Sequence, residues 1–128
     1  MKAHGANRIM IKPFSHEGGF LIPKIERIDN MKIFISQPMR GKTDKEILSE
    51  RAKAIETVKE RYHADVEVID SFFQNAPTDA KPLWFLGKSL ELLSSADVAV
   101  FCNGWKDARG CRIEYNCCSE YGIEHIEL

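Results

Sequence analysis

The chain of 128 residues lacks the features that mark membrane, secreted and nucleic-acid-binding proteins. No apolar run approaches the roughly 20 residues that a membrane-spanning helix needs. The first residues contain no apolar segment of the kind found in secretory signals. The formal net charge is only −1, so no electrostatic argument favours a nucleic acid polymer or a membrane surface as partner. We therefore predict a cytoplasmic protein that binds neither.

Motifs that hold metals, disulfides or nucleotides are also absent. The four cysteines are Cys102, Cys111, Cys117 and Cys118, and their spacings fit neither a zinc site nor a Cys-x-x-Cys redox pair. There is no phosphate-binding Gly-x-x-x-x-Gly-Lys-Ser/Thr loop and no Gly-x-Gly-x-x-Gly. We predict reduced thiols, no metal and no cofactor. Cys111 lies near the N-terminus of a predicted helix, where it is either a small packing residue or a thiol with a lowered pKa.

The remaining composition is that of a globular domain, with 44% hydrophobic and 29% charged residues. Short β-rich runs alternate with segments whose apolar residues recur at helical spacing. The predicted strands are 32–36, 65–70, 97–102 and 123–128. A first helix is predicted after a capping box at Thr43–Glu46, with apolar residues as far as Tyr62. A second begins at Pro82 and carries leucines as far as Leu93, and a third runs from about Arg109 to Tyr121. This alternation predicts an α/β fold with helices on both faces of a parallel sheet of four strands or more, in the order 2-1-3-4.

Residues 1–30 differ from the regular pattern, which starts at Met31. Two apolar segments flank a stretch with two glycines, which is typical of a β-hairpin. Pro13 and Pro23 favour edge strands or an arm over central strands. We therefore treat 1–30 as an N-terminal extension, either an oligomerisation arm or a leader, and 31–128 as the domain.

Two predicted loops would meet at the carboxyl ends of the first and third strands, where ligands bind in open parallel sheets. The first, residues 36–42, offers Arg40 and a helix N-terminus to a phosphate. The second, residues 103–110, precedes a helix on which Glu114 would point back over the loop. Glu114 is therefore either a site carboxylate or simply an acid that the helix dipole favours.

The segments Lys32–Gly41, Ser95–Trp105 and Ala108–Glu114 resemble the nucleoside 2-deoxyribosyltransferase superfamily. They are most similar to its short, uncharacterised branch in bacteria and phages, which has a similar Gly-Trp pair, an Arg-Gly pair and a following glutamate. The resemblance covers about residues 31–126. It implies a flavodoxin-like α/β sandwich, a homo-oligomer, and N-glycosidic bond cleavage or base exchange on a nucleoside or nucleoside 5′-monophosphate.

The resemblance also implies an active site. Glu114 would be the nucleophile that attacks C1′ of the sugar, and its place near a helix N-terminus would favour the anion. Arg40 and Gly41 would hold a 5′-phosphate. The leaving base needs a proton, for which Asp107 and Asn103 are candidates. The other residues expected to bind the substrate are Ser36, Gln37, Met39, Gly104, Trp105, Arg109, Gly110 and Arg112. We expect Glu114 and Arg40 to face each other across a sugar-sized gap.

Two positions depart from the superfamily pattern. An aspartate is common eight residues before the aspartate that opens the third strand, and here Ser89 stands there. The residue two before the nucleophile is often small, and here it is Arg112, which would either reach an anionic substrate or close the pocket. Three hypotheses therefore stand: an enzyme, a nucleotide-binding module without turnover, and a structural or interaction protein. For the enzyme, water or a second base could accept the sugar, so hydrolase and transferase chemistry are both open.

Overall fold

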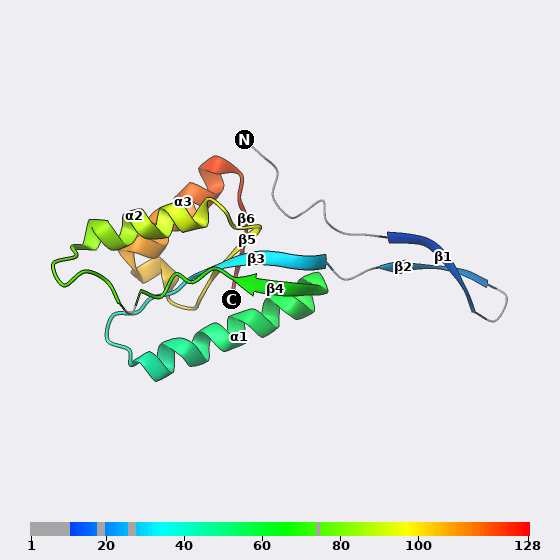
Figure 1. Cartoon of the computed structure of the whole chain (residues 1–128), viewed down its shortest axis with the longest axis horizontal. Coiled ribbons are helices and arrows are strands. Elements are labelled where there is room, and N and C mark those ends of the chain that lie inside the picture. Colours follow the sequence, from blue (N-terminus) through cyan, green and yellow to red (C-terminus); the bar gives the residue numbers. More distant parts are fainter. Residues whose placement is uncertain (1–10, 18–19, 26–27, 74) are drawn as a thin grey trace.

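The structure is a computed structural model of the chain, and it describes residues 11–17, 20–25, 28–73 and 75–128. Its centre is a four-stranded sheet in the order β4-β3-β5-β6, in which every neighbouring pair is parallel (Figure 1). The strands are β3 (Ile28–Ser36), β4 (Ala64–Val68), β5 (Val98–Phe101) and β6 (Glu124–Glu127). The predicted parallel sheet and its strand order are both confirmed.

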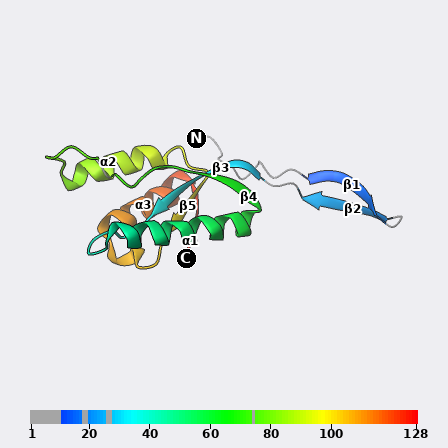
Figure 2. The ribbon, with the colours of Figure 1, turned by 60° about the horizontal axis from the view of Figure 1, so that its bottom comes forward.

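Helices cover both faces of this sheet. Helix α1 (Asp44–Tyr62) lies on one face, and α2 (Pro82–Leu93) and α3 (Arg109–Tyr121) lie on the other, as Figures 1 and 2 show. A 3-10 helix, η2 (Trp105–Asp107), precedes α3. This arrangement of three layers confirms the predicted α/β class and is consistent with a flavodoxin-like fold.

The helix ends follow from local signals in the sequence. The hydroxyl of Thr43, the N-cap of α1, accepts a hydrogen bond from the backbone N–H of Glu46 at 3.2 Å. Pro82 is the first residue of α2, a position whose backbone N–H would have no partner within the helix. The missing N–H of proline therefore costs no hydrogen bond there. Gly122 ends α3 with a φ of 68°, a left-handed conformation that glycine adopts without steric cost. The predicted starts of α1 after Thr43 and of α2 at Pro82, and the predicted extent of α3, therefore agree with the structure.

The core lies on both sides of the sheet because the two central strands are buried on both faces. Ile33 and Ile35 of β3 pack toward α1, together with Val58. Phe34 points to the opposite face, where it packs with Phe101 and with residues of α2 and α3. The alternation of side chains along β3 thus supplies both halves of the core.

Strand β3 begins at Ile28, four residues before the predicted start at Lys32. Ile28 and Met31 are each only 1% exposed, so these apolar side chains belong to the core. Between them Asn30 adopts a φ of 55°, and the register with β4 shifts there. This irregularity interrupts the strand pattern in the sequence. The predicted division of the chain between residues 30 and 31 therefore falls inside a strand.

Before β3, strands β1 (Ile11–Glu17) and β2 (Phe20–Ile25) pair in an antiparallel two-stranded sheet of their own. This confirms the hairpin expected from the sequence. The glycine turn and the first residues of the predicted extension lie outside the described residues. Whether the hairpin serves as an oligomerisation arm stays a prediction.

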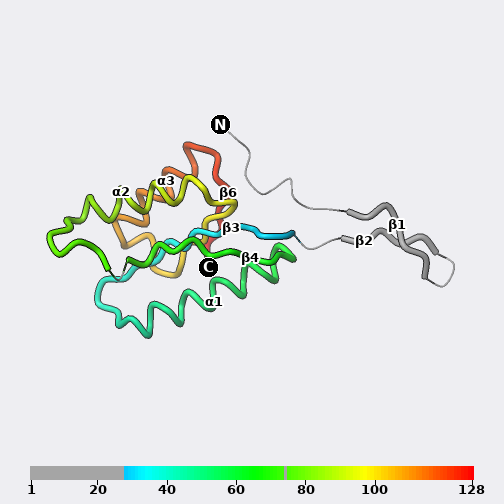
Figure 3. The backbone as a smooth tube through the Cα atoms, in the orientation of Figure 1, coloured from blue at the N-terminus to red at the C-terminus, as the bar shows by residue number. Residues whose placement is uncertain are grey.

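The loops that leave the carboxyl ends of the strands gather at one end of the sheet (Figure 3). Gly104, in the loop after β5, has a φ of 85°, and a Cβ atom added to it would lie 3.8 Å from Cγ of Pro38. Pro38 belongs to the loop after β3. The two loops that the sequence assigned to the switch point are therefore neighbours, as predicted.

Candidate active site

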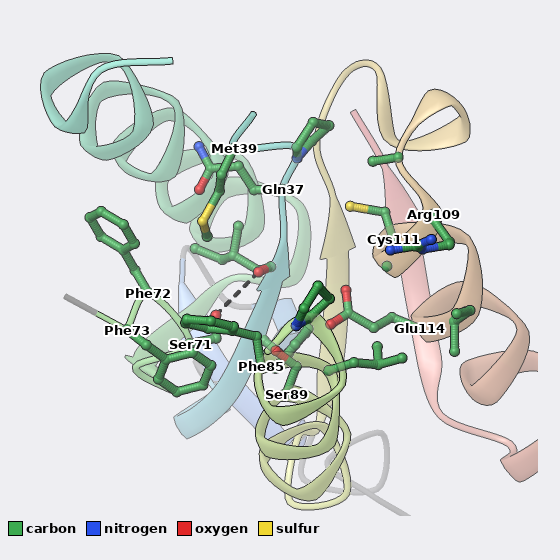
Figure 4. Close-up of a pocket in the computed structure, with 18 of the residues that line it drawn as sticks. Gln37, Met39, Ser71, Phe72, Phe73, Phe85, Ser89, Arg109, Cys111 and Glu114 are labelled. Carbon is green, nitrogen blue, oxygen red and sulfur yellow. Dashed lines mark hydrogen bonds between the residues drawn. The ribbon is translucent and has the colours of Figure 1, made fainter. Parts of the chain in front are cut away.

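A cavity of about 680 Å³ opens at this end of the sheet, a volume typical of sites for small molecules. Its walls come from the ends of β3 and its loop, the loop after β4, helix α2 and the first two turns of α3 (Figure 4). Predicted site residues that line it are Gln37, Met39, Arg109, Gly110 and Glu114. Among the described lining residues, Arg109 and Glu114 are the only ones with ionisable acidic or basic side chains apart from the thiol of Cys111.

Glu114 is held firmly in the wall of this cavity. It is only 7% exposed, and Oε1 accepts a hydrogen bond of 2.7 Å from Oγ of Ser36. The hydroxyl of Ser89 on α2 lies close enough to influence the pKa of the carboxylate as well. Ser36 lies at the end of β3, so three elements meet at this side chain. Ser89, the position that departs from the superfamily pattern, is a neighbour of Glu114.

Burial raises the pKa of Glu114 above its ordinary value of 4.5, while the hydrogen bond from Ser36 and the nearby hydroxyl of Ser89 oppose that rise. We expected the helix N-terminus to favour the anion, whereas the largest influence on this pKa is burial, which favours the neutral acid. Glu114 stands five residues after Arg109, the first residue of α3, and the helix dipole acts mainly within the first turn. Glu114 therefore lies beyond the first turn, and the alternative of a first-turn acid is wrong.

This pKa shift predicts a pH dependence of stability. The folded chain holds the Glu114 proton more tightly than the unfolded chain does, so the contribution is fully present below about pH 4.5 and is lost as pH rises through the raised pKa. The free energy of unfolding of the unmodified protein should therefore fall relative to that of Glu114→Gln as pH rises from about 4.5 through the raised pKa. Denaturant titrations at several pH values measure this difference, and a constant difference would contradict the assignment.

The thiol of Cys111 lies in the same wall, 5% exposed. Burial is the largest influence on it and raises its pKa, against the opposing effect of a hydrogen bond with Ser36. The alternative of a lowered pKa at the helix N-terminus is therefore wrong. Cys111 keeps its proton at neutral pH and acts as a small packing residue next to Ser36.

The opposite wall is aromatic, and the sequence analysis did not assign it to the site. Figure 4 shows Phe72 and Phe73 across the cavity from Glu114. Phe73 packs against Phe85 of α2, with ring centroids 6.3 Å apart, and Trp84 contacts both rings. Ser71 anchors this segment, since its hydroxyl hydrogen-bonds the carbonyl of Ile35 at 3.3 Å, the dashed line in Figure 4.

Polar side chains tie the first loop to α1. The amide nitrogen of Gln37 donates to the carbonyl of Ile47 and to Oε1 of Glu50, both at 2.9 Å. Lys42 forms an ion pair with the same Glu50, also at 2.9 Å. Lys42 is therefore committed to a carboxylate of its own chain. Arg40 is exposed and does not line the cavity, so the expected position of its guanidinium across a sugar-sized gap is not what the structure has.

The aromatic and polar side chains of the second loop contact other residues of the fold and not the cavity. Trp105 stacks on Tyr115 with ring centroids 4.2 Å apart, and its Nε1–H donates to Glu127 at 3.1 Å. Arg112 donates from Nη1 to the carbonyl of Lys106 at 3.0 Å. Trp105 and Arg112 therefore lie outside the cavity, contrary to expectation. Site candidates that do not line it are Ser36, Arg40, Gly41, Asn103, Gly104, Trp105, Asp107 and Arg112.

Comparisons with known proteins give support for the fold alone. No family model and no curated protein matches the chain. A crystal structure of a conserved protein from Enterococcus faecalis V583 is similar, with a TM-score of 0.56 and 17% sequence identity. The match covers 77% of this chain, which spans 62% of the length of that one. At this identity the similarity supports the α/β fold and says nothing about activity.

Two further classes of site were searched within the described residues. No helix there has the length and apolar character required to cross a membrane. No cluster of three or more His, Cys, Asp or Glu side chains suited to a metal ion occurs in that part of the chain. The cavity with Glu114 is thus the candidate site that the described residues offer.

Proposed function

We propose that this protein cleaves or exchanges the N-glycosidic bond of a nucleoside or nucleoside 5′-monophosphate, with Glu114 as the nucleophile. The observation that carries the proposal is the placement of Glu114: a buried carboxylate, oriented by a hydrogen bond from Ser36 and lying near Ser89, in the wall of a cavity of about 680 Å³. The resemblance to nucleoside 2-deoxyribosyltransferases supplies the reaction type.

In the proposed reaction, a carboxylate oxygen of Glu114 bonds to C1′ as the bond from C1′ to the base nitrogen breaks. The base leaves with the electron pair and takes up a proton. The carboxylate also stabilises the positive charge that develops on the sugar ring. Water or a second base then attacks C1′, which releases Glu114 and gives hydrolysis or transfer. The second oxygen of Glu114 stays available for a hydrogen bond to the sugar.

The aromatic wall supports a role in holding the base. Phe72, Phe73 and Phe85 offer apolar surface on which a base can pack, opposite the carboxylate. Asp107 and Asn103 are exposed and do not line the cavity. The proposed proton donor for the leaving base is therefore water rather than either of these side chains.

The test is direct incubation of the protein with a panel of deoxynucleosides and deoxynucleoside monophosphates. Free base is quantified by chromatography, with and without a second base as acceptor. Release of base without an acceptor indicates hydrolysis, and formation of a new nucleoside indicates transfer. If no member of the panel yields base above a protein-free control, the proposal is wrong.

The second candidate is a nucleotide-binding module without turnover. The specific observation that favours it is Ser89, which places a neutral hydroxyl near Glu114 at the position where the superfamily often carries an aspartate. Binding of nucleosides without release of base in the same panel would favour this function.

For phosphorylated ligands, we expect Arg109 to matter more than Arg40. Arg109 lines the cavity at the start of α3, and no side chain caps that helix N-terminus. Arg109→Ala should weaken binding of a nucleoside monophosphate by about tenfold, because a charge-assisted hydrogen bond to phosphate is lost. Binding of the plain nucleoside should change little. Arg40→Ala is the matched control, and calorimetry of both variants checks the prediction. A larger effect of Arg40→Ala would reverse it.

A further inference from the structure

Glu114 is a buried carboxylate that has no cationic partner among the described residues. Among the described residues, it accepts a hydrogen bond from the neutral hydroxyl of Ser36, and the neutral hydroxyl of Ser89 lies nearby. No ion pair of the described residues includes it; those found join Lys42 to Glu50, Lys59 to Glu56 and Lys88 to Glu91. A buried carboxylate without a cation is costly, because desolvation is not offset by an opposite charge. A cation supplied from outside would offset it.

The carboxylate also has room to accept such a cation. A carboxylate has about four lone-pair positions, and two hydroxyls can occupy only some of them. Glu114 lines the cavity directly, whereas Ser36, on which it rests, does not. Arg109 lines the same cavity but is exposed, and within the described part of the chain it forms no ion pair with Glu114. The position beside the carboxylate is therefore open to a ligand group.

We infer that this cavity selects a cationic ring, a protonated cyclic amine of sugar size that carries an apolar aromatic substituent, over the neutral ring of the same shape. The ammonium group binds Glu114, and the substituent packs against Phe72, Phe73 and Phe85 on the opposite wall. The inference rests on the proposed function for the ring shape of the ligand. Its charge follows from the surroundings of Glu114 alone.

The test compares two ligands by calorimetry at neutral pH. One is a hydroxylated pyrrolidine with a benzyl group on its nitrogen, and the other is the cyclopentane in which carbon replaces that nitrogen. We expect the amine to bind about 30-fold more tightly, the effect of one hydrogen bond between charged groups. Glu114→Gln should reduce this preference to about threefold or less, while Glu91→Gln, an exposed change on α2, should leave it intact.

Equal affinities for the two ligands, or no binding of either, would overturn the inference. So would a preference that persists in Glu114→Gln. The comparison on the unmodified protein is decisive even if that variant does not fold. The nucleoside panel separates this result from the proposed function. If the amine is preferred but no base is released, the inference holds and the proposed enzymatic function is wrong. If base is released but the amine is not preferred, the proposed function holds and the inference is wrong.

Discussion

Glu114→Gln is expected to lower the rate of base release by a factor on the order of 10³ or more, with little loss of nucleoside affinity. Glutamine keeps the shape and the acceptor oxygen that meets Ser36 at 2.7 Å, so the fold around the residue should persist. It cannot form a stable bond to C1′ or offset the positive charge of the sugar. Single-turnover measurements of base release, with calorimetry of nucleoside binding, separate chemistry from affinity.

The matched control for this change is Glu91→Gln. Glu91 lies on α2, is exposed and contacts Lys88 at 3.8 Å, far from any role in the cavity wall. An exposed pair of this kind contributes little to stability, so the control variant should keep full activity. If Glu114→Gln releases base as fast as this control, Glu114 is not the nucleophile.

Much of the fold is predictable because its signals are local. The cap at Thr43, Pro82 at the start of α2 and Gly122 at the end of α3 each set a helix boundary by the conformation or hydrogen bond of one residue. The strands between these helices are short, the central strand β5 is apolar throughout, and the handedness of crossovers limits how the strands can be ordered. The start of β3 was missed because Asn30 interrupts the strand pattern with a positive φ.

The site was predictable only in part, because side-chain partners far along the chain decide which loop residues face a cavity. Glu114 could be found because it follows a strand, a loop and one helical turn. Trp105 was expected in the cavity, but Tyr115 offers it a stacking surface 4.2 Å away. Arg40 stands in the correct loop, yet nothing in the local sequence indicates that it does not line the cavity.

The aromatic wall of the cavity was not predicted for the same reason. Phe72 and Phe73 lie in a loop after β4 that has neither helical nor strand periodicity, so no pattern assigns them to a face. They reach the cavity because Ser71 fixes the loop against the carbonyl of Ile35, 36 residues earlier in the chain. A contact over that sequence separation leaves no signal in either segment.

The last prediction concerns Phe101, whose replacement should have the largest effect on stability. Phe101→Ala is expected to lower the free energy of unfolding by about 3–5 kcal/mol. Phe101 is fully buried at the end of β5, and its ring contacts Trp105, Tyr115 and His125 with centroids 5.4, 5.1 and 6.0 Å away. Removing the ring leaves a cavity between the sheet and α3. It also removes the ring that Trp105, Tyr115 and His125 all contact.

Phe72→Ala is the comparison that separates core packing from ligand binding. Phe72 is half-buried in the wall of the cavity, so its loss should cost about 1 kcal/mol of stability or less while weakening the nucleoside that packs on it. Urea titrations of both variants give the two free energies, and calorimetry gives the affinities. A similar loss of stability in both variants would mean that the aromatic wall is part of the folding core rather than a surface kept for a ligand.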